Sequence, residues 1–358
     1  MDNFTTQPDF SNENPQNNSN PVLESNSGTG NTFHLYYKSG FSPEEFKIKK
    51  KIRSTAAGSS ISLLLFFFLS FSFGEVYYLI MSKLGFSTQT AQAIISEPAV
   101  MQVYQIAFSS FLFTVPFIIV QKIRGEKISN LVPIKKVEKE NFIPLFFIGV
   151  AFCVFSNIAA STLSSFFSFI HYEVDFGENP KGFFGVLLTL LSTVAVPALV
   201  EEFACRGIVL GVLRKFGDGF AVVVSAAVFG LIHGNFEQIP FAFLVGIVLG
   251  FIVIKTNSLL VAMAVHAVNN LISVIFSYLS DFISQNAENI SYIILLCVLM
   301  LLGIFTLYFT KNTSEVFKID TGLSEVSEKK KYKWFFSSAW IIVFIVICGL
   351  ESIMYFFI

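Results

Sequence analysis

Long apolar stretches alternate with short polar connections along most of this 358-residue chain. From residue 54 onward there are nine such stretches: 54–81, 100–120, 142–170, 183–213, 220–233, 239–254, 259–283, 290–309 and 335–358. An α-helix needs roughly 20 apolar residues to cross a bilayer. The strict alternation of apolar and polar residues that marks membrane β-barrels does not occur. The pattern predicts an all-α, polytopic helical membrane protein with about eight to nine transmembrane helices.

The beginning of the chain differs from the rest. Residues 1–40 are rich in Asn, Ser, Gln, Thr and Pro, a composition that buries too little apolar surface to fold. The basic run 47–53 follows, and a basic run beside a membrane segment is typical of a cytoplasmic anchor. We therefore expect residues 1–53 to be a disordered polar tail with a basic juxtamembrane end. This tail is not a signal peptide, because it has no basic start and no early apolar run.

Charge refines this interpretation. Only 14% of the residues are charged, against roughly 25% in soluble domains. The basic residues gather after the second, fourth and sixth stretches and before the ninth: Lys122, Arg124, Lys127, Lys135, Lys136, Lys139, Arg214, Lys215, Lys255, Lys329, Lys330 and Lys331. Nine spans in the cell membrane with a cytoplasmic N-terminus would give this distribution.

Overall charge and cysteine content exclude some functions. The net charge of −1 gives no reason to expect a nucleic-acid partner. The four cysteines lie in apolar stretches, and none has the spacing of a C-x-x-C or zinc-ribbon motif. We interpret them as small core residues.

Two adjacent glutamates and an arginine lie within the stretch 183–213. Charge inside a bilayer is costly unless it is paired or faces a polar cavity, so such residues are candidates for function. Glu202 and Arg206 are four residues apart with the acid first, which favours an ion pair on a helix. Glu201 is rotated by about 100° from Glu202. We expect Arg206 to neutralise Glu202, which leaves Glu201 as the reactive carboxylate.

Two further pairs of residues are also spaced by four. Phe229 and His233 end the stretch 220–233, and His266 and Asn270 lie in 259–283. At a rise of about 1.5 Å per residue, Glu201 and His233 lie about 20 Å from the cytoplasmic ends of their helices, and His266 and Asn270 about 10 to 18 Å. These depths predict one polar layer. Taken singly, an intramembrane His or Asn is often only a hydrogen-bonding group between helices.

The chain resembles the CPBP (CAAX protease and bacteriocin-processing) family of intramembrane proteases, also called Abi, in three motifs: Glu201-Glu202-x-x-x-Arg206-Gly207, Phe229-x-x-x-His233 and His266-x-x-x-Asn270. This family includes the Ras-converting CAAX endopeptidase. The resemblance covers about residues 182–275. It implies a protease core over 180–285, with accessory helices over 54–170 and C-terminal helices over 286–358.

The resemblance also implies a membrane-embedded catalytic cavity and a role for each motif residue. Glu201 and His233 would activate a water molecule, while His266 and Asn270 would stabilise the oxyanion of the tetrahedral intermediate. Glu202, Arg206 and Phe229 would support them. Peptide hydrolysis requires a base for the water and donors aimed at the developing charge, which these residue types supply.

Involvement of a metal is an open alternative. The family is often labelled metalloprotease, and two histidines with a carboxylate could form an open zinc site. An H-E-x-x-H motif is absent, however, and water activation by glutamate needs no metal. We favour a mechanism without an obligatory metal.

Two other functions remain alternatives to an endopeptidase acting on a membrane protein or peptide. The first is a non-catalytic immunity or scaffolding protein on the same fold. The second is a proton-coupled transporter that uses the intramembrane Glu and His residues as a relay.

Overall fold

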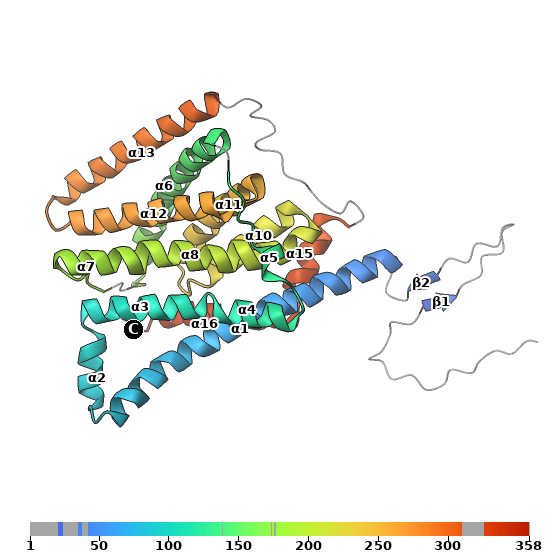
Figure 1. Ribbon diagram of the computed structural model, residues 1–358, viewed down its shortest axis with the longest axis horizontal. Helices are drawn as coiled ribbons and strands as arrows, with labels where there is room; N and C mark the ends of the chain where they lie inside the picture. The colour runs from blue at the N-terminus through green and yellow to red at the C-terminus, as the bar shows by residue number, and fades with distance from the viewer. Residues whose placement is uncertain are drawn as a thin grey trace, which may run out of the picture.

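A computed structural model describes residues 21–23, 35–37, 42–137, 139–172, 174, 177–309 and 326–357. Nearly all of these residues are helical, which confirms the all-α prediction. Two three-residue strands, β1 (Pro21–Leu23) and β2 (Leu35–Tyr37), pair antiparallel, with Val22 opposite Tyr36. Both lie beside the start of the first helix, apart from the helical body (Figure 1).

The first helix, α1 (Pro43–Lys83), begins earlier than the sequence suggested. Ser42 caps it by accepting a hydrogen bond from the Glu45 backbone N–H (3.1 Å), and Pro43 occupies the first turn. The basic run 47–53 is therefore helical, which corrects the expectation that it ends a disordered tail. The rest of that expectation concerns residues 1–41, most of which lie outside the described residues.

Helices α2 (Thr88–Ile95), α3 (Pro98–Leu112) and α4 (Val115–Ile123) follow and pack against α1. The short helix α5 (Ile128–Leu131) and the long helix α6 (Lys139–Phe169) come next. In Figure 1, α3 and α4 lie in line with one another and run alongside the helical segment of residues 182–216. Helix α6 packs against three later helices.

The central rod spans residues 182–216 and consists of consecutive helical segments: α7 (Gly182–Thr189), η1 (Leu190–Ala195), α8 (Val196–Glu202), η2 (Phe203–Val209), α9 (Leu210–Leu213) and η3 (Arg214–Phe216). Segments η1 and η2 are π-helical, an arrangement that recurs at functional sites. They flank α8, which carries both glutamates.

The remaining helices are α10 (Asp218–Leu231), α11 (Gln238–Thr256), α12 (Leu259–Leu279), α13 (Gln285–Tyr308), α15 (Glu328–Phe336) and α16 (Ala339–Met354). Asn257 in the left-handed conformation (φ 47°) ends α11, and the Ser258 side chain caps α12. This tight connection places α11 and α12 side by side.

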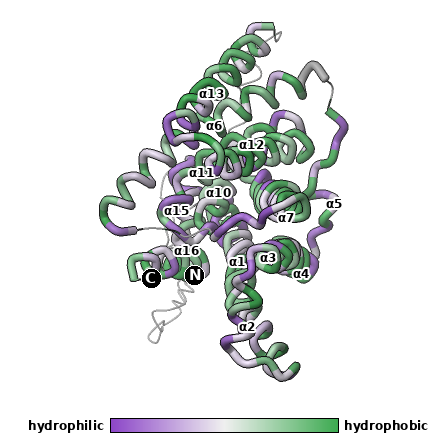
Figure 2. Tube along the Cα trace, turned by 90° about the vertical axis from the view of Figure 1, so that its left-hand side faces the viewer, coloured by the Kyte–Doolittle hydropathy of each residue, from purple (hydrophilic) through white to green (hydrophobic). Residues whose placement is uncertain are grey.

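Hydropathy agrees with a membrane location. Within the described residues, seven helical segments are long and apolar enough to cross a bilayer, or eight if the pair α15–α16, bent by 70°, counts as one span. Helix α10, the fifth predicted stretch, has only 14 residues. Figure 2 shows apolar residues along most of the helices and hydrophilic residues in the connection around α5.

Candidate active site

The double glutamate lies on the last turn of α8, and the structure separates its two side chains. Arg206 Nη1 donates to Glu202 Oε1 over 2.8 Å, and both side chains are fully buried. Glu201 instead lines a cavity, and 15% of its side chain is exposed. The predicted ion pair is confirmed, and Glu201 is the glutamate accessible from the cavity.

Arg206 is held by an aromatic ring as well as by a carboxylate. Its guanidinium carbon lies 4.1 Å from the centre of the Phe229 ring, within cation–π range. The Arg206 Nη2 atom has no hydrogen-bond acceptor and lies where a Cβ on Gly246 would approach it to 3.3 Å. Gly246 thus lets α11 come close to this buried charge. The Phe229 ring therefore covers Arg206 and packs against the rings of both histidines.

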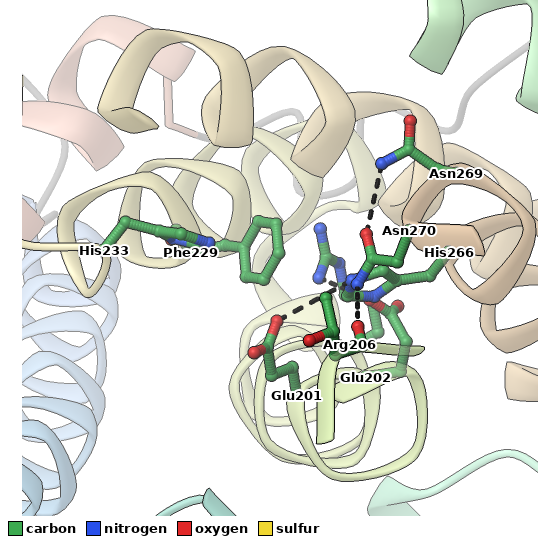
Figure 3. Close-up of polar contacts among 9 residues, drawn as sticks. Glu201, Glu202, Arg206, Phe229, His233, His266, Asn269 and Asn270 are labelled. Atoms are coloured by element: carbon green, nitrogen blue, oxygen red, sulfur yellow. Dashed lines mark hydrogen bonds and ion pairs between the residues drawn. The ribbon is translucent and has the colours of Figure 1, made fainter. Parts of the chain in front are cut away.

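His266 contacts both glutamates. Its Nδ1 lies 2.9 Å from Glu202 Oε1, and its Nε2 lies 3.8 Å from Glu201 Oε2 (Figure 3). Because a carboxylate oxygen accepts, Nδ1 carries a proton and Nε2 points toward Glu201. Glu202 therefore does more than neutralise Arg206, as the sequence suggested, because it also fixes the tautomer and orientation of His266.

His233 is placed just beyond the end of α10. Its Nδ1 lies 2.7 Å from the Phe229 carbonyl oxygen, which can only accept, so Nδ1 is the donor and Nε2 is left with a lone pair. The His233 ring meets the Phe229 ring edge to face, with centroids 4.9 Å apart. In Figure 3 the Phe229 ring lies between His233 on one side and Arg206 and His266 on the other.

Asn270 is held by a chain of amide hydrogen bonds. Its Nδ2 donates to the Thr193 carbonyl over 2.9 Å, and its Oδ1 accepts from Asn269 Nδ2 over 3.2 Å. Asn157 on α6 donates in turn to Asn269 Oδ1 over 3.3 Å. Pro197, which lies four residues after Thr193, also lines the cavity.

A single cavity of about 390 Å³ joins these groups. Four of its lining residues are Glu201, His233, His266 and Asn270, which come from α8, the turn after α10, and α12. The remaining lining residues are Gln105, Thr193, Pro197, Phe229, Gln238, Phe241, Ala242, Val245, Asn269 and Ser273. The four residues predicted to share a polar layer therefore line the same cavity, which combines a carboxylate, two imidazoles and an amide.

The side chains do not fit a metal site as they are arranged. Among the described residues, no three His, Cys, Asp or Glu side chains are close enough together to hold an ion. His266 Nε2 lies 3.8 Å from Glu201 Oε2, but the Phe229 ring lies between His266 and His233 (Figure 3). We therefore derive no catalytic step through a metal.

Some site residues were not foreseen from the sequence. Asn269 and Asn157 hold Asn270, while Gln105 and Gln238 line the cavity. Asn269 directly precedes Asn270, so a double asparagine in an apolar helix was an available signal. Asn157 gives no such signal, because it is one of several polar residues along α6, its neighbour Ser156 among them.

Comparison with known proteins gives one match. Residues 183–272 match the family described as "Type II CAAX prenyl endopeptidase Rce1-like". No curated protein and no solved structure matches the chain. The matched segment runs from α7 into α12 and contains Glu201, His233, His266 and Asn270. Helices α1–α6 and α13–α16 lie outside it.

Proposed function

We propose that this chain, whose residues 183–272 match the Rce1-like family of type II CAAX prenyl endopeptidases, is an intramembrane endopeptidase that hydrolyses peptide bonds of a membrane-associated protein or peptide. The observation that carries this proposal is the partly exposed carboxylate of Glu201. It shares one cavity with two histidines, whereas Glu202 is fully buried and paired.

Water activation is assigned to Glu201 and His233. Arg206 is bonded to Glu202 rather than to Glu201, whose closest ionic contact is His266 Nε2 at 3.8 Å, so the Glu201 carboxylate can accept a proton from water. His233 keeps a lone pair on Nε2 because its Nδ1–H is bonded to the Phe229 carbonyl. That lone pair can accept the second hydrogen of the same water and orient its oxygen. Glu201 then passes its proton to the leaving amine.

Stabilisation of the oxyanion is assigned to Asn270 and His266. One amide hydrogen of Asn270 is bonded to Thr193, which leaves the other for the cavity. Nδ1 of His266 is bonded to Glu202, so its donor toward the cavity is Nε2 when that nitrogen is protonated. Donors fixed in advance at the site of developing charge contribute strongly to catalysis.

We further propose that the protein resides in the cell membrane with its N-terminus in the cytoplasm. The basic run 47–53 at the start of α1 and the basic connection between α4 and α6 both support this orientation. Cysteine accessibility tests it: a cysteine introduced at Lys127 should be protected from an impermeant reagent applied outside intact cells.

The test of the proposed activity uses purified protein in liposomes. The family description names a prenyl endopeptidase, so a farnesylated peptide ending in a CAAX sequence is the first substrate and the unprenylated peptide is its control. We expect cleavage by the wild type and none by His233→Ala. Equal cleavage by His233→Ala would contradict the assigned role. Pure protein that cleaves neither peptide nor any membrane protein would favour an immunity or scaffolding function.

Replacement of Asn269 should impair turnover by misplacing the Asn270 amide. Asn269→Leu removes the donor that fixes Asn270 Oδ1, so the Asn270 amide can rotate away from the cavity. Misplacement of a catalytic group by about 1 Å can cost 100-fold, and we expect kcat to fall about 10- to 100-fold with little change in KM. Asn289→Leu on the exposed surface of α13 is the control. A normal kcat in Asn269→Leu would show that Asn270 needs no such support.

Chelation tests the proposal that no metal is required. After dialysis against EDTA, the liposome-embedded protein should retain most of its peptidase activity, because water activation is assigned to Glu201 and His233. The matching measurement is metal content by mass spectrometry before and after dialysis. Activity that disappears with a stoichiometric metal and returns on adding it back would overturn this assignment.

A further inference from the structure

The turn that carries His233 lies outside a regular helix and is held by specific hydrogen bonds. His233 lies beyond the end of α10, where its backbone N–H bonds to the Gly230 carbonyl over 3.1 Å. Gly234 follows with φ +66°, a conformation that side chains other than glycine rarely adopt. Asn235 braces the turn from within by donating to the His233 carbonyl (3.0 Å). Residues outside a regular helix depend on such contacts to hold their position.

A residue distant in sequence holds the far end of this turn. The Tyr172 hydroxyl accepts a hydrogen bond from the Phe236 backbone N–H over 2.8 Å, and the Tyr172 side chain is fully buried. The Tyr172 ring also packs near the Phe236 ring, with centroids 5.8 Å apart. Tyr172 follows α6 and lies outside the segment that matches the protease family.

The C-terminal end of the chain packs on Tyr172. The Phe356 ring meets it edge to face with centroids 4.7 Å apart, and the Tyr355 ring lies 5.9 Å away. One turn earlier, Glu351 of α16 lies against the turn itself, because a Cβ on Gly234 would be 2.7 Å from the Glu351 carboxylate carbon. Two independent contacts therefore connect the last helix of the chain with the turn around His233.

We infer that Tyr172, Glu351, Tyr355 and Phe356 form a support that positions His233, which gives the C-terminal helix α16 a role in catalysis. The inference rests on the proposed function for the role of His233. These four are positioning residues, since none of them lines the cavity. Their effect passes through the Phe236 N–H bond and the Gly234 contact to the His233 backbone, and from there to the Nε2 atom that faces the water.

Tyr172→Phe tests the support most selectively, because it removes one hydroxyl and keeps the ring. Without its acceptor, the Phe236 amide should exchange with deuterated solvent at least about tenfold faster, as amides released from hydrogen bonds do. Hydrogen exchange with mass spectrometry of peptides covering residues 231–238 measures this. Tyr308→Phe is the matched control, because Tyr308 is 83% exposed on α13. Unchanged exchange in Tyr172→Phe would overturn the inference.

A second variant tests the contribution of α16. Tyr355→Leu combined with Phe356→Leu should accelerate exchange in the same peptides, whereas Phe357→Leu, at an 84% exposed position, should not. On the farnesylated peptide, both support variants should lower kcat several-fold and leave KM unchanged. A purely structural role would instead lower the amount of folded protein without changing kcat per folded molecule.

The two readouts separate this inference from the proposed function. If the wild-type protein cleaves nothing, the proposed function fails, and hydrogen exchange still decides whether Tyr172 and α16 hold the turn. If the wild type is active and exchange accelerates while kcat is unchanged, the turn is held but its position does not matter for catalysis. That outcome would overturn the inference.

Discussion

Glu201→Gln is expected to abolish peptide cleavage while leaving a folded protein. Glutamine fills the same volume and cannot accept the proton of the attacking water. Loss of a general base typically lowers the rate by about 10²- to 10⁴-fold. Glu201 forms no hydrogen bond to Arg206, and its closest ionic contact is His266 Nε2 at 3.8 Å. Its replacement should therefore cost little stability.

The experiment compares cleavage rate and unfolding temperature in the same preparations. Glu97→Gln is the matched control, because Glu97 is an exposed glutamate at the start of α3 with no side-chain cap bond. Cleavage by Glu201→Gln within a factor of about three of the wild type would remove Glu201 from the mechanism. A loss of folded protein instead would show that Glu201, like Glu202, is needed for the stability of the fold.

Arg206→Met should have the opposite effect, a large loss of stability. It leaves the fully buried Glu202 carboxylate without its 2.8 Å partner, and breaking a buried ion pair typically costs about 3–5 kcal/mol. The measurement is the free energy of unfolding in mixed detergent micelles. Lys215→Met is the control, because its 3.7 Å pair with Glu126 is partly exposed and surface pairs contribute about 0–1 kcal/mol.

The double variant Glu202→Gln with Arg206→Met sharpens this prediction. It should recover part of the lost stability, because no unpaired charge then remains buried. It should not recover activity, because Glu202 also fixes His266 through a 2.9 Å contact. If the double variant is as unstable as the sum of its parts, the ion pair is not the cause of the instability.

Helical spacing alone predicted the parts of the site that lie within one helix. The i,i+4 order of Glu202 and Arg206 gave their ion pair, and the 100° rotation separated Glu201 from it. The depths of Glu201, His233, His266 and Asn270 along their helices predicted one polar layer, and the four residues line one cavity. These predictions succeed because helix geometry is nearly invariant.

Contacts that depend on how helices pack could not be predicted in the same way. The 2.9 Å contact between His266 and Glu202 depends on how α12 is rotated about its axis relative to α8. The pattern of apolar residues does not determine that rotation. The π-helical segments on either side of α8 also rotate the side chains of residues 182–216 away from the positions that a continuous α-helix would give them. The contact of α16 with the His233 turn joins residues more than 100 positions apart, and no local pattern in either segment indicates it.

The most direct measurement is mass-spectrometric mapping of newly formed protein termini in membranes of cells that express either the wild type or Glu201→Gln at equal levels. We expect a small set of membrane-associated proteins to be cleaved in wild-type membranes and to remain intact in Glu201→Gln membranes. The same set of cleaved proteins in both membranes would contradict the proposal that this chain is an intramembrane endopeptidase whose catalysis depends on Glu201.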